Sequence, residues 1–289
     1  MFNRNSVNKI QFISAVILYG TIGMFLRYAS LPSATIAMCR GIIGTFFILL
    51  YMKIKGININ KQSIKNNFKW LILSGILLGL NWIFLFAAYD VTTIAIASLC
   101  NYMAPIILLI ITPLVLKEEI NKKKLPYVFL AFIGIVLVSR ILEGEKGNFL
   151  GVTLGLIAAL CFVGIVLCNK KMSKISPLEK ASMQLIISAI TILPYVLVHD
   201  LSTPLIIDAK SIFFVLMLGI IHTGLAYVFY FNGLGSLPVQ SVVILGYLEP
   251  AISVLTSFFI LHEELSFLGW IGTLLILSSV LSEIEIKRS

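Results

Sequence analysis

Charged side chains are scarce in this sequence. They make up 12% of its 289 residues, while hydrophobic residues make up 59%, and a soluble domain has about 25% charged residues. This balance excludes an ordinary soluble domain and predicts an integral membrane protein with little mass outside the bilayer. Cysteine is also rare, and no two cysteines have the spacing of metal ligands or suggest a disulfide. All four lie in apolar segments and are interpreted as buried thiols: Cys39, Cys100, Cys161 and Cys168.

The motifs of several enzyme classes are absent. The sequence contains no G-x-x-x-x-G-K-[ST] loop for ATP hydrolysis, and no H-E-x-x-H, G-x-S-x-G or C-x-x-C motif. His262 and the two glutamates after it lack the second histidine of a zinc motif. We therefore expect no enzyme, no catalytic residues, no metal site and no cofactor.

Ten apolar segments stand out along the chain, and a membrane-spanning helix needs about 20 such residues. The links between them are short, apart from a lysine-rich stretch that we expect to be a polar loop from Lys53 to Lys69. The sequence therefore predicts an all-α membrane protein with ten transmembrane helices. The expected spans are 10–29, 33–52, 69–89, 93–116, 125–142, 149–169, 179–198, 211–233, 238–261 and 266–284.

The basic residues predict how these spans are oriented. A net charge of +9 can indicate a nucleic-acid partner, but here the lysines lie in short links beside apolar segments, where they act as orientation signals. If the N-terminus is cytoplasmic, 17 of the 22 basic residues fall on the inner side. Only Arg140, Lys146 and Lys210 fall in outer links, and Arg27 and Arg40 lie within or at the edge of spans. We expect both termini in the cytoplasm and no nucleic-acid partner.

A sequence phrase occurs twice, 145 residues apart. Tyr102-Met-Ala-Pro105 is followed by the acidic pair Glu118-Glu119, and Tyr247-Leu-Glu-Pro250 by Glu263-Glu264. The offset is half the chain length, which predicts two copies of one unit, residues 1–144 and 145–289. Each copy has five spans, and an odd number of spans inverts the second copy relative to the first.

Each copy of the phrase places a proline near the middle of a span. A proline inside a helix has no N–H and leaves the carbonyl four residues back without its donor, here the carbonyl of Asn101 for Pro105 and that of Gly246 for Pro250. In hydrocarbon, such irregular backbone is tolerated only against protein or a wet cavity. The two prolines therefore indicate helix breaks beside a central cavity, with a purely packing role as the alternative.

Two fully charged side chains, Arg40 and Glu249, lie well inside spans. Charges in a membrane are costly and are usually functional or paired. Desolvation favours the neutral form of a carboxyl group, so Glu249 is a candidate for proton coupling or for binding a cationic group. A protonated carboxyl that bonds the backbone near the proline is the structural alternative. Arg40 either holds an anionic group of a substrate or is a structural arginine that reaches toward the interface.

Other polar and aromatic side chains lie at similar depths in different spans. Together they suit a small amphipathic ligand, although singly each is more often a packing residue. The additional candidate substrate-binding residues are Tyr19, Asn81, Trp82, Asn101, Tyr102, His222, Tyr227, Tyr230 and Tyr247. Two further motifs, Gly75-x-x-x-Gly79 and Gly151-x-x-x-Gly155, predict close contacts between helices.

With these residues the chain resembles the drug/metabolite transporter superfamily, specifically its ten-helix permeases with two EamA-type repeats. The resemblance covers nearly the whole chain and rests on the repeated proline-x12-glutamate phrase, on Leu248-Glu249-Pro250 and on Arg40. It implies an inverted five-plus-five bundle around a central cavity, and alternating access without ATP. Members move amino acids, other metabolites, sugars or drugs, and many bacterial members export. The repeats differ in charge, since Arg40 aligns with Leu185 and Glu249 with Ala104.

We therefore expect a secondary-active transporter of the bacterial inner (plasma) membrane, with amino-acid export as the leading hypothesis. Its expected partners are a small-molecule substrate and the lipid bilayer, and the protein is expected to be a monomer or a homodimer. The first alternative is transport of cationic or hydrophobic compounds such as quaternary amines, which an anionic Glu249 among aromatic rings would favour. An alternative of another class is a lipid-handling or structural membrane protein without an aqueous cavity.

Overall fold

The computed structural model describes residues 4–117, 119, 121–139, 148–200, 208–262 and 264–285. The predicted boundary between the repeats, at residues 144 and 145, falls outside this described part. So do six charged residues that were used above to recognise the repeat and orient the chain: Glu118, Arg140, Lys146, Glu263, Lys287 and Arg288.

The first half of the described chain is helical. Side-chain caps start two of its helices, because the side chain of Asn60 accepts the N–H of Ser63, and that of Thr93 accepts the N–H of Ile96. The elements are α1 (Arg4–Leu26), α2 (Ser33–Ile54), α3 (Lys61–Val91), α4 (Ile94–Asn101), α5 (Ala104–Leu116), the 3-10 turn η1 (Lys122–Lys124) and α6 (Leu125–Val138).

The second half is helical as well, with two π-helical turns that continue α-helices. The helix that begins at Pro177 starts with a capping box, in which the side chains of Ser176 and Glu179 each bond the other's backbone N–H. The elements are α7 (Phe149–Lys171), α8 (Pro177–Tyr195), η3 (Val196–Asp200), α9 (Ala209–Gly219), η4 (Ile220–Leu225), α10 (Ala226–Ser236), α11 (Val239–Gly246), α12 (Leu248–Leu261) and α13 (Phe267–Glu285).

Eight helical segments of the described chain are long and apolar enough to cross a bilayer. The apolar stretch of α13, Phe267–Ser282, is shorter, and α6 has 14 residues. The eight segments are Val7–Leu26, Ser33–Ile54, Lys61–Val91, Ile96–Leu116, Phe149–Lys171, Pro177–Asp200, Ala209–Ser236 and Val239–Leu261.

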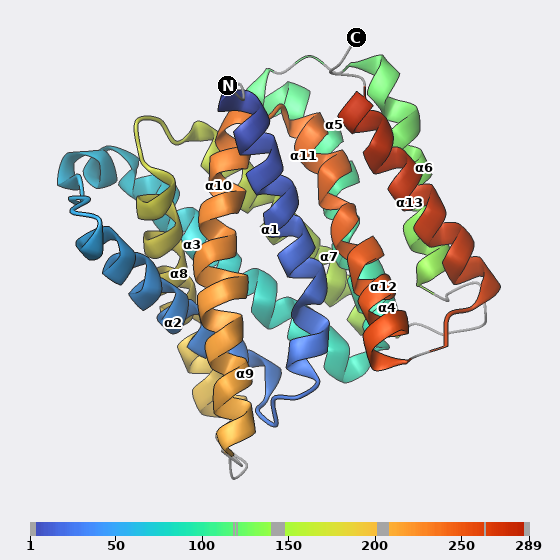
Figure 1. Cartoon of the computed structure of the whole chain (residues 1–289), viewed down its shortest axis with the longest axis horizontal. Coiled ribbons are helices and arrows are strands. Elements are labelled where there is room, and N and C mark those ends of the chain that lie inside the picture. The colour runs from blue at the N-terminus through green and yellow to red at the C-terminus, as the bar shows by residue number, and fades with distance from the viewer. Residues whose placement is uncertain are drawn as a thin grey trace.

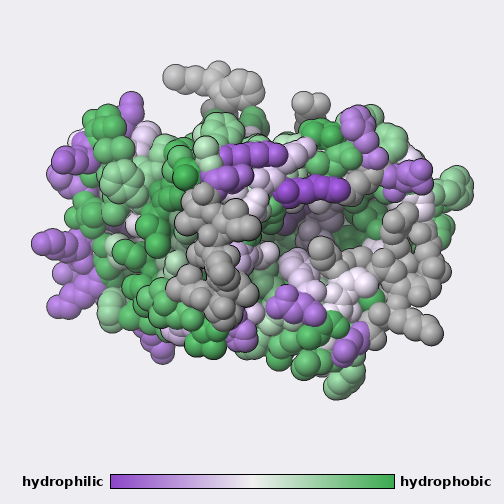
Figure 2. All heavy atoms as spheres, turned by 90° about the horizontal axis from the view of Figure 1, so that it is seen from below, coloured by the Kyte–Doolittle hydropathy of each residue, from purple (hydrophilic) through white to green (hydrophobic). Residues whose placement is uncertain are grey.

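The surface of the bundle confirms an integral membrane protein. Large apolar side chains point outward, and Phe46, Leu114 and Phe259 are 68%, 79% and 63% exposed. A soluble monomer rarely exposes a broad apolar surface, so these side chains are expected to contact lipid. Seen from below, hydrophilic side chains gather near the middle of the face, and hydrophobic ones make up much of its outline (Figure 2).

The link expected as a polar loop up to Lys69 is helical over its last part. The helix α3 already begins at Lys61, eight residues before the predicted span. Asn60 provides the cap, and lysine and glutamine are good helix formers. The predicted span did not include these residues because the helix extends beyond the apolar segment.

The principal packing pairs join one half of the chain to the other. The helix α3 packs against α7 and α8, α2 against α8 and α9, α1 against α10 and α12, and α6 against α13. In Figure 1, α6 and α13 lie side by side at one edge, and α1 begins at the end of the bundle where α13 ends. The largest buried cluster includes Leu108 of α5, Val163 of α7 and Ile244 of α11.

Both glycine motifs lie at close helix contacts, as predicted. A Cβ atom added to Gly79 would lie 2.6 Å from Cβ of Thr191 on α8, and one added to Gly155 would lie 2.7 Å from Cβ of Cys100 on α4. Real Cβ atoms do not approach so closely, so these positions need glycine for packing. By contrast, nothing lies within 4 Å of a Cβ added to Gly23 of α1.

We expect Gly79→Ala to destabilise the protein and Gly23→Ala to leave its stability unchanged or slightly raised. Both changes gain about 1 kcal/mol of helix propensity, but only the first forces α3 and α8 apart, at a cost of about 1–3 kcal/mol. Thermal unfolding of the detergent-purified variants measures the difference. Equal midpoints for the two variants would contradict the close contact.

Candidate functional site

Two helices are interrupted within the repeated phrase. Tyr102 and Met103 separate α4 from α5, and Tyr247 separates α11 from α12. Pro105 and Pro250 then fall in the first turn of the following helix, where a missing backbone N–H leaves no bond unmade. Each proline is thus accommodated at a helix start, and the backbone is irregular just before it.

The second interruption sets Glu249 in the first turn of α12, where the unpaired N–H groups of a helix start favour an acidic side chain. The side chain is only part-buried, and no hydrogen bond to its carboxyl group is found among the described residues. The carboxyl oxygens of Glu249 can therefore accept hydrogen bonds from a ligand. Groups within electrostatic reach of the carboxyl are the guanidinium of Arg40 and the hydroxyls of Tyr19, Tyr102, Tyr227 and Tyr230.

Arg40 reaches the same region from α2. Its side chain is 7% exposed, its Nε donates to Oγ1 of Thr223 at 3.0 Å, and its guanidinium lies 5.5 Å from the ring centre of Trp82. Thr223 is fixed in turn, since its hydroxyl donates to the carbonyl of Leu218 across the π-helical turn η4. In the described part of the chain, the two terminal amino groups of Arg40 make no hydrogen bond, so they can still bind an anionic oxygen.

Three of the predicted tyrosines form an aromatic group beside these charges. The ring of Tyr19 on α1 lies 5.9 Å from that of Tyr227 and 6.0 Å from that of Tyr230, both on α10. Phe12 and Phe231 pack behind them, 5.2 Å and 5.5 Å from the ring of Tyr230. The structure thus brings Tyr19, Tyr227 and Tyr230 together.

His222 has a different setting from the tyrosines. Its ring is 2% exposed, with Nε2 2.9 Å from Oγ1 of Thr21 and Nδ1 3.4 Å from the carbonyl oxygen of Met217. The ring also contacts Phe25 at 4.5 Å. Both nitrogens have partners, so in this conformation His222 joins α1 to η4, and its role toward a ligand stays a prediction.

Asn81 and Asn101 support the first helix interruption. The side-chain amide of Asn81 donates to Oδ1 of Asn101 at 3.2 Å and to the carbonyl of Ala158 at 2.8 Å. These bonds tie α3 to the end of α4 and to α7. The two asparagines lie together, as expected from their predicted depths.

Tyr247 is placed apart from any cavity wall. It is 0% exposed and belongs to the main hydrophobic cluster, and its hydroxyl has no hydrogen-bond partner among the described residues. The hydroxyl of Tyr230 is also without one. An unpaired buried hydroxyl costs about 1–3 kcal/mol, and a substrate role for Tyr247 stays a prediction.

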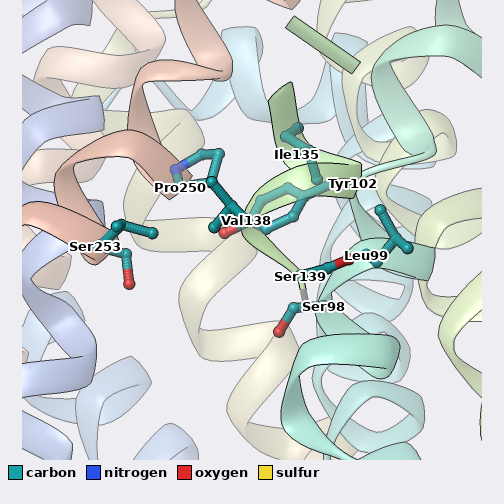
Figure 3. A pocket seen from close by; sticks show the side chains of 9 residues that line it. Ser98, Leu99, Tyr102, Ile135, Val138, Ser139, Pro250 and Ser253 are labelled. Atoms are coloured by element: carbon teal, nitrogen blue, oxygen red, sulfur yellow. The ribbon is translucent and has the colours of Figure 1, made fainter. Parts of the chain in front are cut away.

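A cavity of about 140 Å3 lies beside the two interruptions. In Figure 3, Pro250 and Ser253 of α12 face Ser98, Leu99 and Tyr102 across it, and α6 closes one side. Tyr102 and Pro250 were predicted from the sequence, but the three serines of the lining, Ser98, Ser139 and Ser253, were not. Serine is common in membrane helices, and only the folded chain brings these together. The remaining lining residues are Ile135 and Val138 of α6, Ser139 directly after it, and Val254 of α12.

The arrangement can bind opposite charges. No group of three histidine, cysteine or acidic side chains that could hold a metal occurs in the described part of the chain. The guanidinium and the carboxyl lie on different halves, close to aromatic rings and hydroxyl groups. Such a site suits a small polar ligand with both anionic and cationic groups.

The fold is shared with solved structures. One crystal structure, described only as that of a protein, superposes with a TM-score of 0.81 at 17% identity and covers 94% of this chain and 96% of its own. Among relatives, "Uncharacterized transporter YxxF" of Bacillus subtilis is 24% identical over 87% of this chain and 81% of its own length. "Uncharacterized transporter YwfM" of the same organism is 26% identical over 96% and 94%.

A protein from a second organism is similar over nearly the same extent. An "Uncharacterized transporter" of Archaeoglobus fulgidus is 26% identical over 93% of both chains. The profile of the EamA-like transporter family matches twice, over residues 9–140 and 149–282, and so covers most of the sequence. These two matches include α2 with Arg40 and α12 with Glu249. The chain therefore belongs to the EamA-like transporter family, a family of multi-pass membrane transporters.

Proposed function

We propose that this transporter is secondary-active, lies in the bacterial plasma membrane and exports an amino acid by alternating access, without ATP hydrolysis. The observation that carries the proposal is the pair Arg40 and Glu249, opposite charges from different halves within electrostatic reach of each other. An amino acid has a carboxylate and an ammonium group on one carbon. A guanidinium binds a carboxylate with two parallel hydrogen bonds, and the Glu249 carboxylate suits the ammonium group.

In this proposal the chain crosses the membrane ten times, with α6 and α13 as the two spans beyond the eight long ones. Both are apolar, they pack against each other, and both run alongside the other helices (Figure 1). Ser279 of α13 donates to the carbonyl of Tyr127 at 2.6 Å, and Gly134 and Gly272 allow the backbones to approach closely. An even number of spans agrees with α1 beginning and α13 ending at one end of the bundle.

An inverted repeat is supported by the pattern of helix contacts. In the proposed repeat, α1, α2 and α3 correspond to α7, α8 and the pair α9 and α10. The α3–α7 contact then corresponds to the α10–α1 contact, and the α3–α8 contact to the α9–α2 contact. All four contacts are present. The helices that follow the two prolines also end alike, with Lys117 and His262, 145 residues apart, in the left-handed conformation. The described lysines lie mostly where α1 begins, which supports cytoplasmic termini.

Transport of cationic compounds is the second candidate. It is favoured by the part-buried Glu249 with tyrosine hydroxyls and rings around it, since such a cage binds a quaternary amine through cation–π contacts. Arg40 opposes it, because a second cation in the same space would be repelled. Competition between choline and a carboxylate ligand distinguishes the two candidates.

Protein reconstituted in liposomes is expected to exchange at least one labelled amino acid against its unlabelled form. Arg40→Met should lower this exchange at least tenfold, because the carboxylate of the substrate loses its partner, whereas Arg27→Met at the exposed end of α1 should retain it. Exchange of none of the twenty amino acids by folded protein would overturn amino-acid export. Exchange of choline alone would favour the second candidate.

We expect Glu249→Gln to abolish accumulation driven by a pH gradient and to retain measurable but weaker exchange without a gradient, because the amide oxygen still accepts a hydrogen bond from the ammonium group but carries no charge. The amide keeps the shape and polarity of the side chain but cannot bind and release a proton. The matched control is Glu264→Gln, the same change at an exposed position. Gradient-driven accumulation by Glu249→Gln at the wild-type rate would remove Glu249 from proton coupling.

A water-filled cavity can be detected by cysteine labelling at the second interruption. In a variant without the four native cysteines, Gly246→Cys should react with a charged methanethiosulfonate reagent, because nothing lies within 4 Å of a Cβ there. Ala251→Cys on α12, at a position that is 0% exposed, should not react. Equal protection of both positions from either side of the membrane would favour the dry, non-transporting alternative.

A further inference from the structure

A second cleft lies at the end of the bundle where α1 begins, which the proposed orientation makes cytoplasmic. Its volume is about 370 Å3, within the range of about 300–1,000 Å3 typical of small-molecule sites. Three helices contribute to it, and we call it the α1–α8–α10 cleft. It is lined by Asn8, Ile175, Pro177, Lys180, Phe231, Asn232, Gly235 and Ser236.

Lys180 brings a buried positive charge into this cleft. The side chain is 8% exposed, and its Nζ lies 3.4 Å from the carbonyl oxygen of Asn169, at the limit of a hydrogen bond. An ammonium group has three donors, so this one contact leaves most of its capacity unused. A buried cation without a counter-ion is unfavourable, and a bound anion would compensate it.

The acidic neighbour of Lys180 does not neutralise it. Glu179 instead accepts the backbone N–H of Asn60 at 2.7 Å and that of Ser176 at 3.0 Å, and the hydroxyl of Ser63 at 3.3 Å. A second cation lies within electrostatic reach, since the ammonium group of Lys170 interacts with that of Lys180 and donates to the carbonyl of Leu237.

The rest of the lining suits a small polar anion. It contains no acidic side chain, and the amides of Asn8 and Asn232 provide neutral hydrogen-bond donors. From these observations we propose that the α1–α8–α10 cleft binds the carboxylate or phosphate group of a molecule with net negative charge, and that it is the first binding site of an anionic substrate entering from the cytoplasm. The second part of this proposal rests on the proposed export function.

A short row of aromatic rings lies between the cleft and the central charges. Phe231 lines the cleft, and its ring lies 5.5 Å from that of Tyr230 and 5.7 Å from that of Tyr227. Tyr227 interacts electrostatically with Arg40. The cleft and the central charges therefore lie along one face of α10, with these packed rings between them.

The test uses the full chain, purified in a neutral detergent and freed of anionic lipid. Glutamate and glutamine serve as probes of nearly equal size that differ by one negative charge, and inorganic phosphate serves as a third probe. We expect glutamate and phosphate to bind in titration calorimetry and glutamine to bind at least tenfold more weakly. High salt should weaken the binding of both anions, because screening reduces the attraction.

Two variants attribute the binding to this cleft. Lys180→Met should lower the affinity for glutamate and phosphate at least tenfold, and Lys65→Met, an equal charge loss at an exposed position on α3, should not. If Lys180→Met does not fold, Lys180→Arg should fold and keep the binding, and Lys170→Met should weaken it. Equal affinities of wild type and Lys180→Met, or of glutamate and glutamine, would overturn the anion site.

A lipid headgroup carries the same phosphate chemistry, so the titration is repeated with added phosphatidylglycerol. If the lipid competes with glutamate and Lys180→Met removes both, the cleft binds soluble anions as proposed. Binding of the lipid alone would overturn the substrate site. Transport measurements with the same variants distinguish the two proposals. Exchange by Lys180→Met at the wild-type rate would contradict only the entry site. A wild-type protein that binds anions but exchanges no amino acid would contradict only the transport function.

Discussion

The structure depends on one constraint, the need of every backbone N–H and C=O group in a membrane for a hydrogen-bond partner. A continuous helix satisfies this need with its own backbone hydrogen bonds, but the interrupted backbone before Pro105 and Pro250 does not. The first lies against the amide of Asn81, which donates to the side-chain oxygen of Asn101 and to the carbonyl of Ala158 on α7. The second is covered by α1, because a Cβ added to Gly20 would lie 2.7 Å from the carbonyl oxygen of Glu249. Irregular backbone is thus confined to the interior, where the charges lie.

The two halves that we propose to be repeats carry an asymmetric site. Leu185, the counterpart of Arg40, is 0% exposed, and Ala104, the counterpart of Glu249, is 2% exposed; both belong to the main hydrophobic cluster. The same backbone position is therefore a packing position in one repeat and a charged position in the other. This division keeps the two charges apart in sequence and lets them meet only when the halves assemble.

Composition and apolar segments predicted the membrane class and the long apolar helices, and the two Gly-x-x-x-Gly motifs predicted the glycine contacts, because these depend on local sequence. The details of the candidate site depend on partners far along the chain. The bond from Arg40 to Thr223 joins residues 183 positions apart, and it needs the π-helical turn η4, for which the sequence has no clear signal. Lys180 lies at the edge of the expected span 179–198, and only the folded chain, in which α10 packs against α8, buries it.

Arg40 and Glu249 lie on helices that pack against different neighbours in the bundle. Carboxylates fix both ends of the segment formed by α8 and η3: Glu179 bonds the backbone of Asn60 before α3, and Asp200 accepts the N–H and the hydroxyl of Thr35 at the start of α2, at 2.8 Å and 2.6 Å. Arg40 lies on α2 within this group, whereas Glu249 lies on α12, which packs on α1 and α13. Any shift of α12 relative to α2 therefore changes the separation of the charges, and a ligand that bridges them binds one arrangement more tightly than another.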